Sequence, residues 1–351
     1  MAESAHLVGL GARTPVGLSL PAASAAVRAG IAVFGDHAYM VDSHGAPVLV
    51  AADALLPADM PLTDRLGEMC SAAAQEATQS LPAGCPVHVM LALPPPDRPG
   101  VEPGLAQRVW AAIDAALQGQ VVYRSRSVVA EGHAGALRAL AGGLSLLHDD
   151  PQALVLVVAA DSYLTADALE WLEQGHQLYH DGNPWGFIPG EAAGAVLLGS
   201  QRLVSHLQLP SWGRLLSCGA AVEHNLIKTE QVCLGQGLTD ALRGALSRLP
   251  EGRLVDRMVC DLNGEPYRAD EYGYTRVRLS RVLSDPGAFL TPAESWGDVG
   301  AASGTLFVGL AAMAATRAPD HGGHVLVWTG SESGLRTAAL LDLETPQRSR
   351  A

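Results

Sequence analysis

The chain has 351 residues, of which 48% are hydrophobic and 17% charged, and its formal net charge is −13 at pH 7. A disordered chain would be poorer in apolar residues, so the composition indicates a folded protein with an ample core. No block of Lys or Arg stands out. Nucleic acid is therefore not expected as a partner, because binding by counterion release needs a basic face.

Strands and helices are predicted to alternate through the first 200 residues. A short apolar strand over 5–12 leads through a turn-rich segment to a helix over 19–30, and residues 31–60 are predicted to form an irregular connection. The pattern then predicts helices over 62–81, 103–118 and 134–147, the last of them rich in small residues. Between and after them it predicts a buried strand over 87–93, an alternating strand over 121–130 and a central strand over 153–163. Residues 186–200 are predicted to be a hairpin-like pair of strands.

The second half repeats this alternation. We predict a helix over 238–249 and a small-residue helix over 299–316. A strand with its loop is predicted over 256–264, and a strand with its turn over 324–334. Such alternation predicts an α/β fold with helices on both faces of a sheet. The two halves echo each other, which suggests an internal duplication. We expect an N-terminal half over 1–200, a C-terminal half over 201–345 and a disordered tail over 346–351.

The termini and the cysteines indicate a cytoplasmic protein. Residues 1–17 lack the cationic start and apolar run of a secretory signal. No apolar stretch is long enough to span a bilayer, so no membrane association is expected. The five cysteines are scattered and odd in number, which fits reduced thiols better than a disulfide framework: Cys70, Cys85, Cys218, Cys233 and Cys260.

Several common site motifs fail at specific residues. In GLGARTPVG (9–17), Thr14 stands where a dinucleotide-binding loop needs its third glycine. The segment 330–334 carries Glu332 where a serine-hydrolase elbow has its serine. HGGH (321–324) lies in a predicted turn and is expected to be solvated rather than a metal site. We therefore expect no cofactor and no metal.

Five segments, in order and over nearly the whole chain, resemble the β-ketoacyl synthase family. They are GLGARTPVG, the helix over 62–81, AADSY (159–163), GFIPGEAAGAVLL (186–198) and WGDVGAASGTLFVGLAAM (296–313). The resemblance implies a thiolase-like fold, with two similar halves in a five-layer αβαβα arrangement. It also implies a dimer and action on acyl thioesters.

The family's chemistry needs a cysteine at a helix N-terminus, where the helix dipole stabilises its thiolate, and two histidines that stabilise the developing oxyanion. Matching the motifs puts His133 at the cysteine position, Asn263 at the first histidine and Asp298 at the second. None of the five cysteines lies at the start of this helix. The resemblance therefore implies a degenerate, catalytically inactive member.

Two interpretations of these positions stay open. A helix N-terminus disfavours an imidazolium, so a neutral His133 oriented by Asp298 could act as a general base in hydrolysis or proton transfer. The other interpretation is a filled and inert former active site.

The polar run 261–272 also has two interpretations. Glu265, Arg268 and Glu271 form either an ion-paired loop, through Glu265–Arg268 or Arg268–Glu271 pairs, or a binding surface for a protein or small ligand.

We predict a non-enzymatic protein that binds another protein. It resembles cysteine-less synthase-like proteins associated with type VI secretion effectors, for which it would be an adaptor. The alternatives are a chain-length-factor-like partner of an active ketosynthase and an enzyme with altered chemistry centred on His133 and Asp298.

The expected assembly is a homodimer, or a heterodimer with a related or effector protein. The strand over 121–130 would pair across the interface, with Arg124 and Arg126 predicted on one face. An acyl carrier protein, itself normally acidic, gains no general electrostatic support from a chain of this charge.

Overall fold

The computed structural model describes residues 4–226, 229, 231–317 and 323–343. The strands are β1 (Ala5–Arg13), β2 (Gly35–Val41), β3 (Pro47–Val50), β4 (Cys85–Ala92), β5 (Val121–Val129), β6 (Leu154–Ser162), β7 (Glu191–Gly199), β8 (Arg214–Val222), β9 (Arg257–Cys260), β10 (Phe289–Leu290), β11 (His324–Gly330) and β12 (Leu335–Asp342). The helices are α1 (Leu20–Arg28), α2 (Leu62–Thr78), α3 (Leu105–Ala116), α4 (Gly135–Asp149), α5 (Ala166–Gln174), α6 (Gln201–Leu207), α7 (Gln236–Ala245), α8 (Pro266–Leu279), α9 (Ala293–Trp296) and α10 (Ser303–Arg317). The predicted tail over 346–351 lies outside the described residues.

Two five-stranded half-sheets have the same internal order. The strands run β5-β4-β6-β7-β1 in the first half-sheet and β10-β9-β11-β12-β8 in the second. In each, the first three strands are parallel and the last two join antiparallel. The half-sheets meet where Ala5 and His6 of β1 pair with Leu215 and Arg214 of β8. This repeated order agrees with the predicted internal duplication, and the division at residue 200 stays a prediction.

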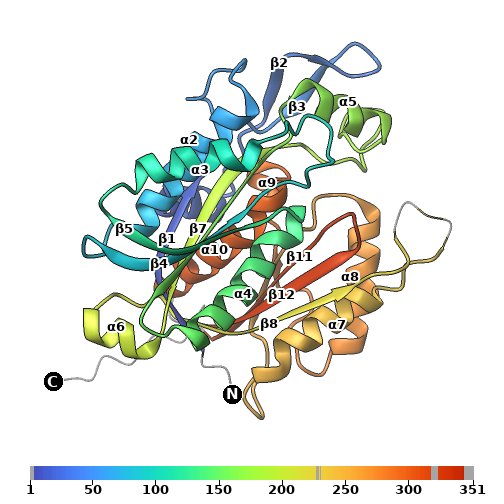
Figure 1. Cartoon of the computed structure of the whole chain (residues 1–351). Coiled ribbons are helices and arrows are strands. Elements are labelled where there is room, and N and C mark those ends of the chain that lie inside the picture. Colours follow the sequence, from blue (N-terminus) through green and yellow to red (C-terminus); the bar gives the residue numbers. More distant parts are fainter. Residues whose placement is uncertain (1–3, 227–228, 230, 318–322, 344–351) are drawn as a thin grey trace.

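Helices cover and separate the half-sheets in five layers (Figure 1). α2 and α3 pack on the outer face of the first half-sheet, and α7 and α8 pack on the outer face of the second. α4 and α10 lie between the two and contact strands of both. The predicted thiolase-like αβαβα fold is confirmed.

Small residues let these layers approach closely. A Cβ on Gly9 would lie 1.9 Å from the Ala77 carbonyl oxygen, and one on Gly11 would lie 2.1 Å from that of Ala73. The glycines of GLGARTPVG therefore let α2 pack onto the backbone of β1. In the middle layer, a Cβ on Gly304 of α10 would lie 2.9 Å from the Ala136 Cβ of α4.

Three predictions of secondary structure were wrong. Residues 31–60 contain the β2–β3 hairpin instead of an irregular connection, because Asp42 caps a tight turn by accepting the His44 and Ala46 amides. Residues 186–200 form no hairpin: only Glu191–Gly199 is a strand, and it inserts between β1 and β6. The run 261–272 is not all loop, because α8 starts at Pro266, where a proline is well tolerated in a helix.

The HGGH motif does not lie wholly in a solvated turn. His324 is buried as the first residue of β11, whereas residues 321 and 322 lie outside the described residues. Among the described helices, none has the length and apolarity required to cross a bilayer.

Candidate functional site

Two helix starts converge at one end of the middle layer. His133 lies in a 3₁₀ turn, Gly132–Ala134, which runs directly into α4. Asp298 precedes a second 3₁₀ turn, Gly300–Ala302, which runs into α10. Gly300 has φ +48°, and a Cβ there would lie 2.1 Å from the Asp161 Oδ2 atom, so this close approach needs a glycine.

The structure brings His133, Asn263 and Asp298 together. The His133 Nε2 atom lies 2.7 Å from Asp298 Oδ1, which also accepts the Gly300 amide at 2.8 Å. Asn263 Nδ2 donates to Asp298 Oδ2 at 2.7 Å. Both side chains of the His133–Asp298 pair are buried, so the carboxylate has protein partners in place of water.

Electrostatics favour the charged forms of the pair. Burial opposes the charge on Asp298, but the adjacent His133 outweighs it and holds the pKa of Asp298 well below its usual value. Burial likewise opposes the imidazolium, yet the Asp298 charge raises the pKa of His133 above 6.5. The Asp298 carboxylate thus acts on the imidazolium in the opposite direction to the helix N-terminus, which disfavours it.

The other three predicted residues belong to an adjoining buried network, with one pairing different from expectation. Arg268 Nε lies 3.5 Å from Glu265 Oε2, which is the predicted pair at long range. The shorter contact of Arg268 is to Asp261 Oδ2, at 2.9 Å. Glu271 pairs with Arg336 at 2.8 Å instead of with Arg268. Glu265 also accepts from Asn263 Nδ2 at 3.1 Å, which joins this network to the site.

Ser331, which sequence reasoning did not single out, ties the β11–β12 turn to the start of α4. Its Oγ accepts the Ala134 amide at 2.9 Å and donates to the Glu131 carbonyl oxygen. The only sequence cue was its place in GSESG, which indicates a turn but no partner 197 positions away. Ser331 therefore holds the backbone on both sides of His133.

A second buried ion pair, also missed, supports the loop beneath Asp298. Arg98 NH1 lies 2.7 Å from Asp161 Oδ1, and Asp161 Oδ2 accepts the Ala301 amide at 2.9 Å. Arg98 lies over the Tyr163 ring, 4.5 Å from its centroid. The AADSY segment thus supplies a structural anchor for the turn that leads into α10.

Cavities lie on both sides of the His133–Asp298 pair. One of about 340 Å³ is lined by His133, Arg98, Trp171 and Ser331, among others. Another of about 440 Å³ is lined by Asn263, Glu265 and Asp298, among others. Each member of the pair therefore lines one of the two cavities.

No cysteine lines either cavity. All five are free thiols, and burial raises the pKa of Cys218 to about 12 and those of Cys70 and Cys260 still further. Thiols of this kind carry almost no thiolate at neutral pH.

One group in the described part of the chain has metal-ligand spacing, and it is already satisfied. Glu223, Cys233 and Glu271 place ligand atoms within 4.8 Å of one another. Glu223 Oε2 accepts the Gly237 amide, and Glu271 accepts Arg336 through both oxygens. A cation there would compete with the Arg336 guanidinium.

Similarity searches define the fold. No protein-family model matches the sequence, and no curated protein does either. Among solved structures, the ishigamide ketosynthase/chain length factor is similar with a TM-score of 0.78 and 16% identity, over 98% of this chain and 100% of that one. The chain has a ketosynthase-like, thiolase-like fold.

Other ketosynthase-fold structures agree. The ketosynthase from module 6 of the bacillaene synthase of Bacillus subtilis matches with a TM-score of 0.77 and 13% identity, over 98% of this chain and 73% of that one. A β-ketoacyl synthase from Burkholderia phymatum matches with a TM-score of 0.72 and 14% identity, over 97% and 99%. The similarity spans the whole ketosynthase-like architecture.

Proposed function

We propose that this protein is a non-catalytic ketosynthase-fold subunit that acts by binding a second protein. The observation that carries the proposal is the buried His133–Asp298 ion pair at the start of α4. An acyl-transfer site needs a nucleophile at such a helix start, where the dipole stabilises a developing anion. Here that place holds an imidazole that is paired with a buried carboxylate, and this carboxylate raises the pKa of His133 above 6.5.

Two hydroxyl groups near His133, those of Ser331 and Tyr163, are poorly placed to act as a replacement nucleophile. The Ser331 hydroxyl both accepts the Ala134 amide and donates to the Glu131 carbonyl, so no base is positioned to take its proton. Burial raises the pKa of Tyr163 well above 10, which keeps this phenol protonated at neutral pH. These assignments support a binding role over acyl transfer.

The open edge of β5 is the proposed binding surface. In the part of the chain that the structure describes, β5 pairs only with β4, so its outer backbone groups are free to join another strand. Arg126 of β5 is neutralised by Asp114 at 2.8 Å and stacks over Tyr123. If β5 pairs with a second strand, the repulsion between arginines across the interface is therefore smaller than it would be with Arg126 unpaired.

The identity of the partner has two candidates. One is a second ketosynthase-fold chain, either another copy or an active synthase, as in the similar structure described as a ketosynthase/chain length factor. The other is a secretion effector for which this chain is an adaptor. Pull-down from the native host separates them, because a synthase would be recovered in the first case and an effector in the second.

Catalysis is tested by incubating the protein with acyl-CoA and acyl-carrier thioesters. We expect intact-mass spectrometry to show no covalent adduct. A mass increase that matches the acyl group would overturn the proposal, and peptide mapping would locate the residue.

A second candidate function is general-base hydrolysis by His133. It is favoured by the cavity of about 340 Å³ that His133 lines, which would admit a small thioester. If this function operates, thioester hydrolysis is measurable and His133→Gln abolishes it. We expect equal rates for the wild type and this variant, because the Asp298 charge raises the pKa of His133 and so favours the protonated imidazole, which is not a base.

A further inference from the structure

A large pocket lies away from the His133 site. It has a volume of about 760 Å³ and is formed by α1, the edge strand β10, β9, α10 and β11. Its residues come from the last turns of α1 and α10 and from the first residues of β9 and β11. His133 and Asp298, by contrast, precede the first turns of α4 and α10. The pocket is therefore at the opposite end of α10 from the ion pair.

Three arginines border this pocket, and none has an acidic partner among the residues that the structure describes: Arg28, Arg257 and Arg317. All three are exposed. In a chain of net charge −13, three unpaired arginines around one pocket form an uncommon positive centre. A guanidinium binds a carboxylate or phosphate well, through planar paired hydrogen bonds.

The floor of the pocket is apolar. Leu310, Ala311, Val259 and Val325 line it, and each exposes 5% or less of its surface. A docked helix, about 10 Å across, packs on a broad exposed apolar face, whereas these four side chains are almost wholly buried. A thin hydrocarbon chain, which enters between side chains, suits the floor better.

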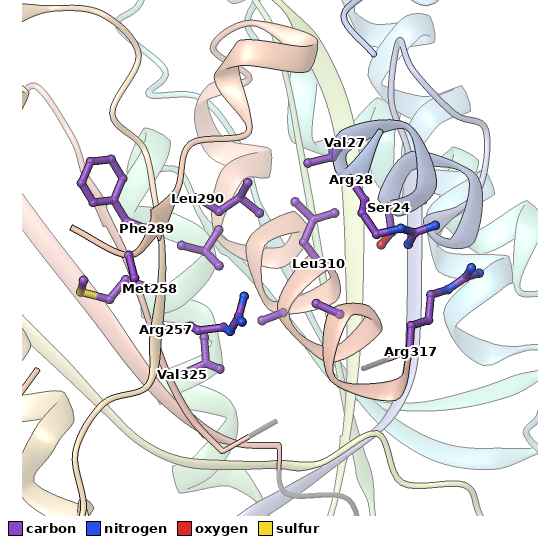
Figure 2. Close-up of a pocket in the computed structure, with 14 residues that line it drawn as sticks. Ser24, Val27, Arg28, Arg257, Met258, Phe289, Leu290, Leu310, Arg317 and Val325 are labelled. Carbon is purple, nitrogen blue, oxygen red and sulfur yellow. The ribbon is translucent and has the colours of Figure 1, made fainter. Parts of the chain in front are cut away.

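Two of the three arginines lie on the side of the pocket away from Phe289. Figure 2 shows Arg28 and Arg317 on one side and Phe289 and Met258 on the other, with Arg257 and Leu310 between them. Phe289 and Leu290, on the edge strand, are 38% and 39% exposed and would be covered by an occupant. This separation matches a molecule with an anionic head and an apolar tail.

We propose that this pocket binds an anionic amphiphile, with its carboxylate or phosphate head at Arg28 and Arg317 and its hydrocarbon tail along α10 toward Phe289. The volume is within the range of about 300–1,000 Å³ that small-molecule sites occupy. The proposal does not depend on the proposed function, because the two use different ends of the middle layer.

The test is calorimetric titration of the whole protein with dodecanoate below its micelle-forming concentration. Dodecyl phosphate, dodecanol and dodecyltrimethylammonium carry the same tail with a different head. We expect the two anions to bind and the neutral and cationic compounds to bind at least tenfold more weakly. Each methylene added from octanoate to dodecanoate should strengthen binding, by up to about fourfold at full burial.

Variants locate the site. Arg28→Gln and Arg317→Gln should each weaken dodecanoate binding about tenfold, because each removes a charge-assisted hydrogen bond. Ala314→Phe, which fills the pocket, should abolish it. Arg202→Gln, at an exposed arginine of α6, is the matched control and should bind as the wild type does. Thermal midpoints of all variants verify that they are folded.

Several outcomes overturn the proposal. They are absence of dodecanoate binding, equal binding of dodecyltrimethylammonium, and binding unchanged by the Arg28→Gln and Arg317→Gln substitutions. Self-association that the same substitutions abolish would assign the pocket to a second copy of the chain. Binding of an acidic amphipathic peptide without dodecanoate binding would assign it to a protein partner.

Discussion

His133 and Asp298 lie 165 positions apart in the sequence, and their Nε2 and Oδ1 atoms are 2.7 Å apart. Asn263 and the Gly300 amide complete the shell of the carboxylate. A buried pair of this kind contributes little net stability, because desolvation offsets the attraction between the charges. Loss of one partner is different, since it leaves the other charge buried without compensation.

Substitution of His133 by Ala should therefore destabilise the protein by about 3–5 kcal/mol. The measurement is urea unfolding followed by circular dichroism. His206→Ala, at an exposed histidine of α6, is the control and should change stability by less than about 0.5 kcal/mol. A change for His133→Ala as small as that of the control would show that Asp298 does not depend on this partner.

The stability of the pair should also depend on pH. Because the folded pKa of His133 is raised above 6.5, its contribution is fully present below pH 6.5 and is lost as the pH rises through the folded value. The stability advantage of the wild type over His133→Gln should thus shrink between pH 6 and pH 9. An advantage that grows with pH would mean that His133 is neutral in the folded protein.

The residues of the site could be predicted from the sequence only in part. Motif order was enough to place His133, Asn263 and Asp298 in one cluster. Local spacing suggested Arg268 as the partner of Glu271, but the partner is Arg336, 65 positions away on β12. Such a pairing follows from how strands are arranged in space, which no local pattern encodes.

Helices and strands were predicted best where the hydrophobic pattern extends over many residues. The helices around 62–81 and 134–147 and the strand around 153–163 appear with ends shifted by a few residues. The β2–β3 hairpin was missed because most of its residues are exposed and show no clear alternation. Pro189 lies before β7 and has no amide hydrogen, so it cannot donate to a sheet as a strand residue would.

The edge strand β5 should control association. Val128 is 43% exposed on that strand, and Val128→Arg should leave the fold intact while weakening strand pairing with a partner at least tenfold. Val277→Arg, at a 71% exposed valine of α8, is the matched control. Sedimentation velocity and pull-down measure how strongly each variant associates with a partner. Equal loss of association in both would mean that β5 is not the interface.

Across the whole molecule, one core joins the two half-sheets. The largest apolar cluster includes residues of β1, β6 and β7 together with residues of β8, β11 and β12, all packed on α4 and α10. Neither half can expose these helices without exposing that core. The two halves should therefore unfold together.

This cooperativity is testable by calorimetry. We expect one endothermic transition whose van't Hoff enthalpy equals its calorimetric enthalpy. Tryptophan fluorescence and far-ultraviolet circular dichroism should give the same midpoint, although Trp296 and Trp328 belong to different clusters. Two resolved transitions would show that the halves are independent.

The position of α4 between two half-sheets has a consequence for biosynthesis. The ribosome delivers β1 to β7 before any strand of the second half-sheet exists, and α10 follows more than 150 residues after α4. Until then, the apolar side of α4 that will contact β8, β12 and α10 has no cover. The nascent chain thus passes through a long stage in which a finished half-sheet carries an exposed apolar helix, and a chaperone or a waiting partner subunit would protect it there.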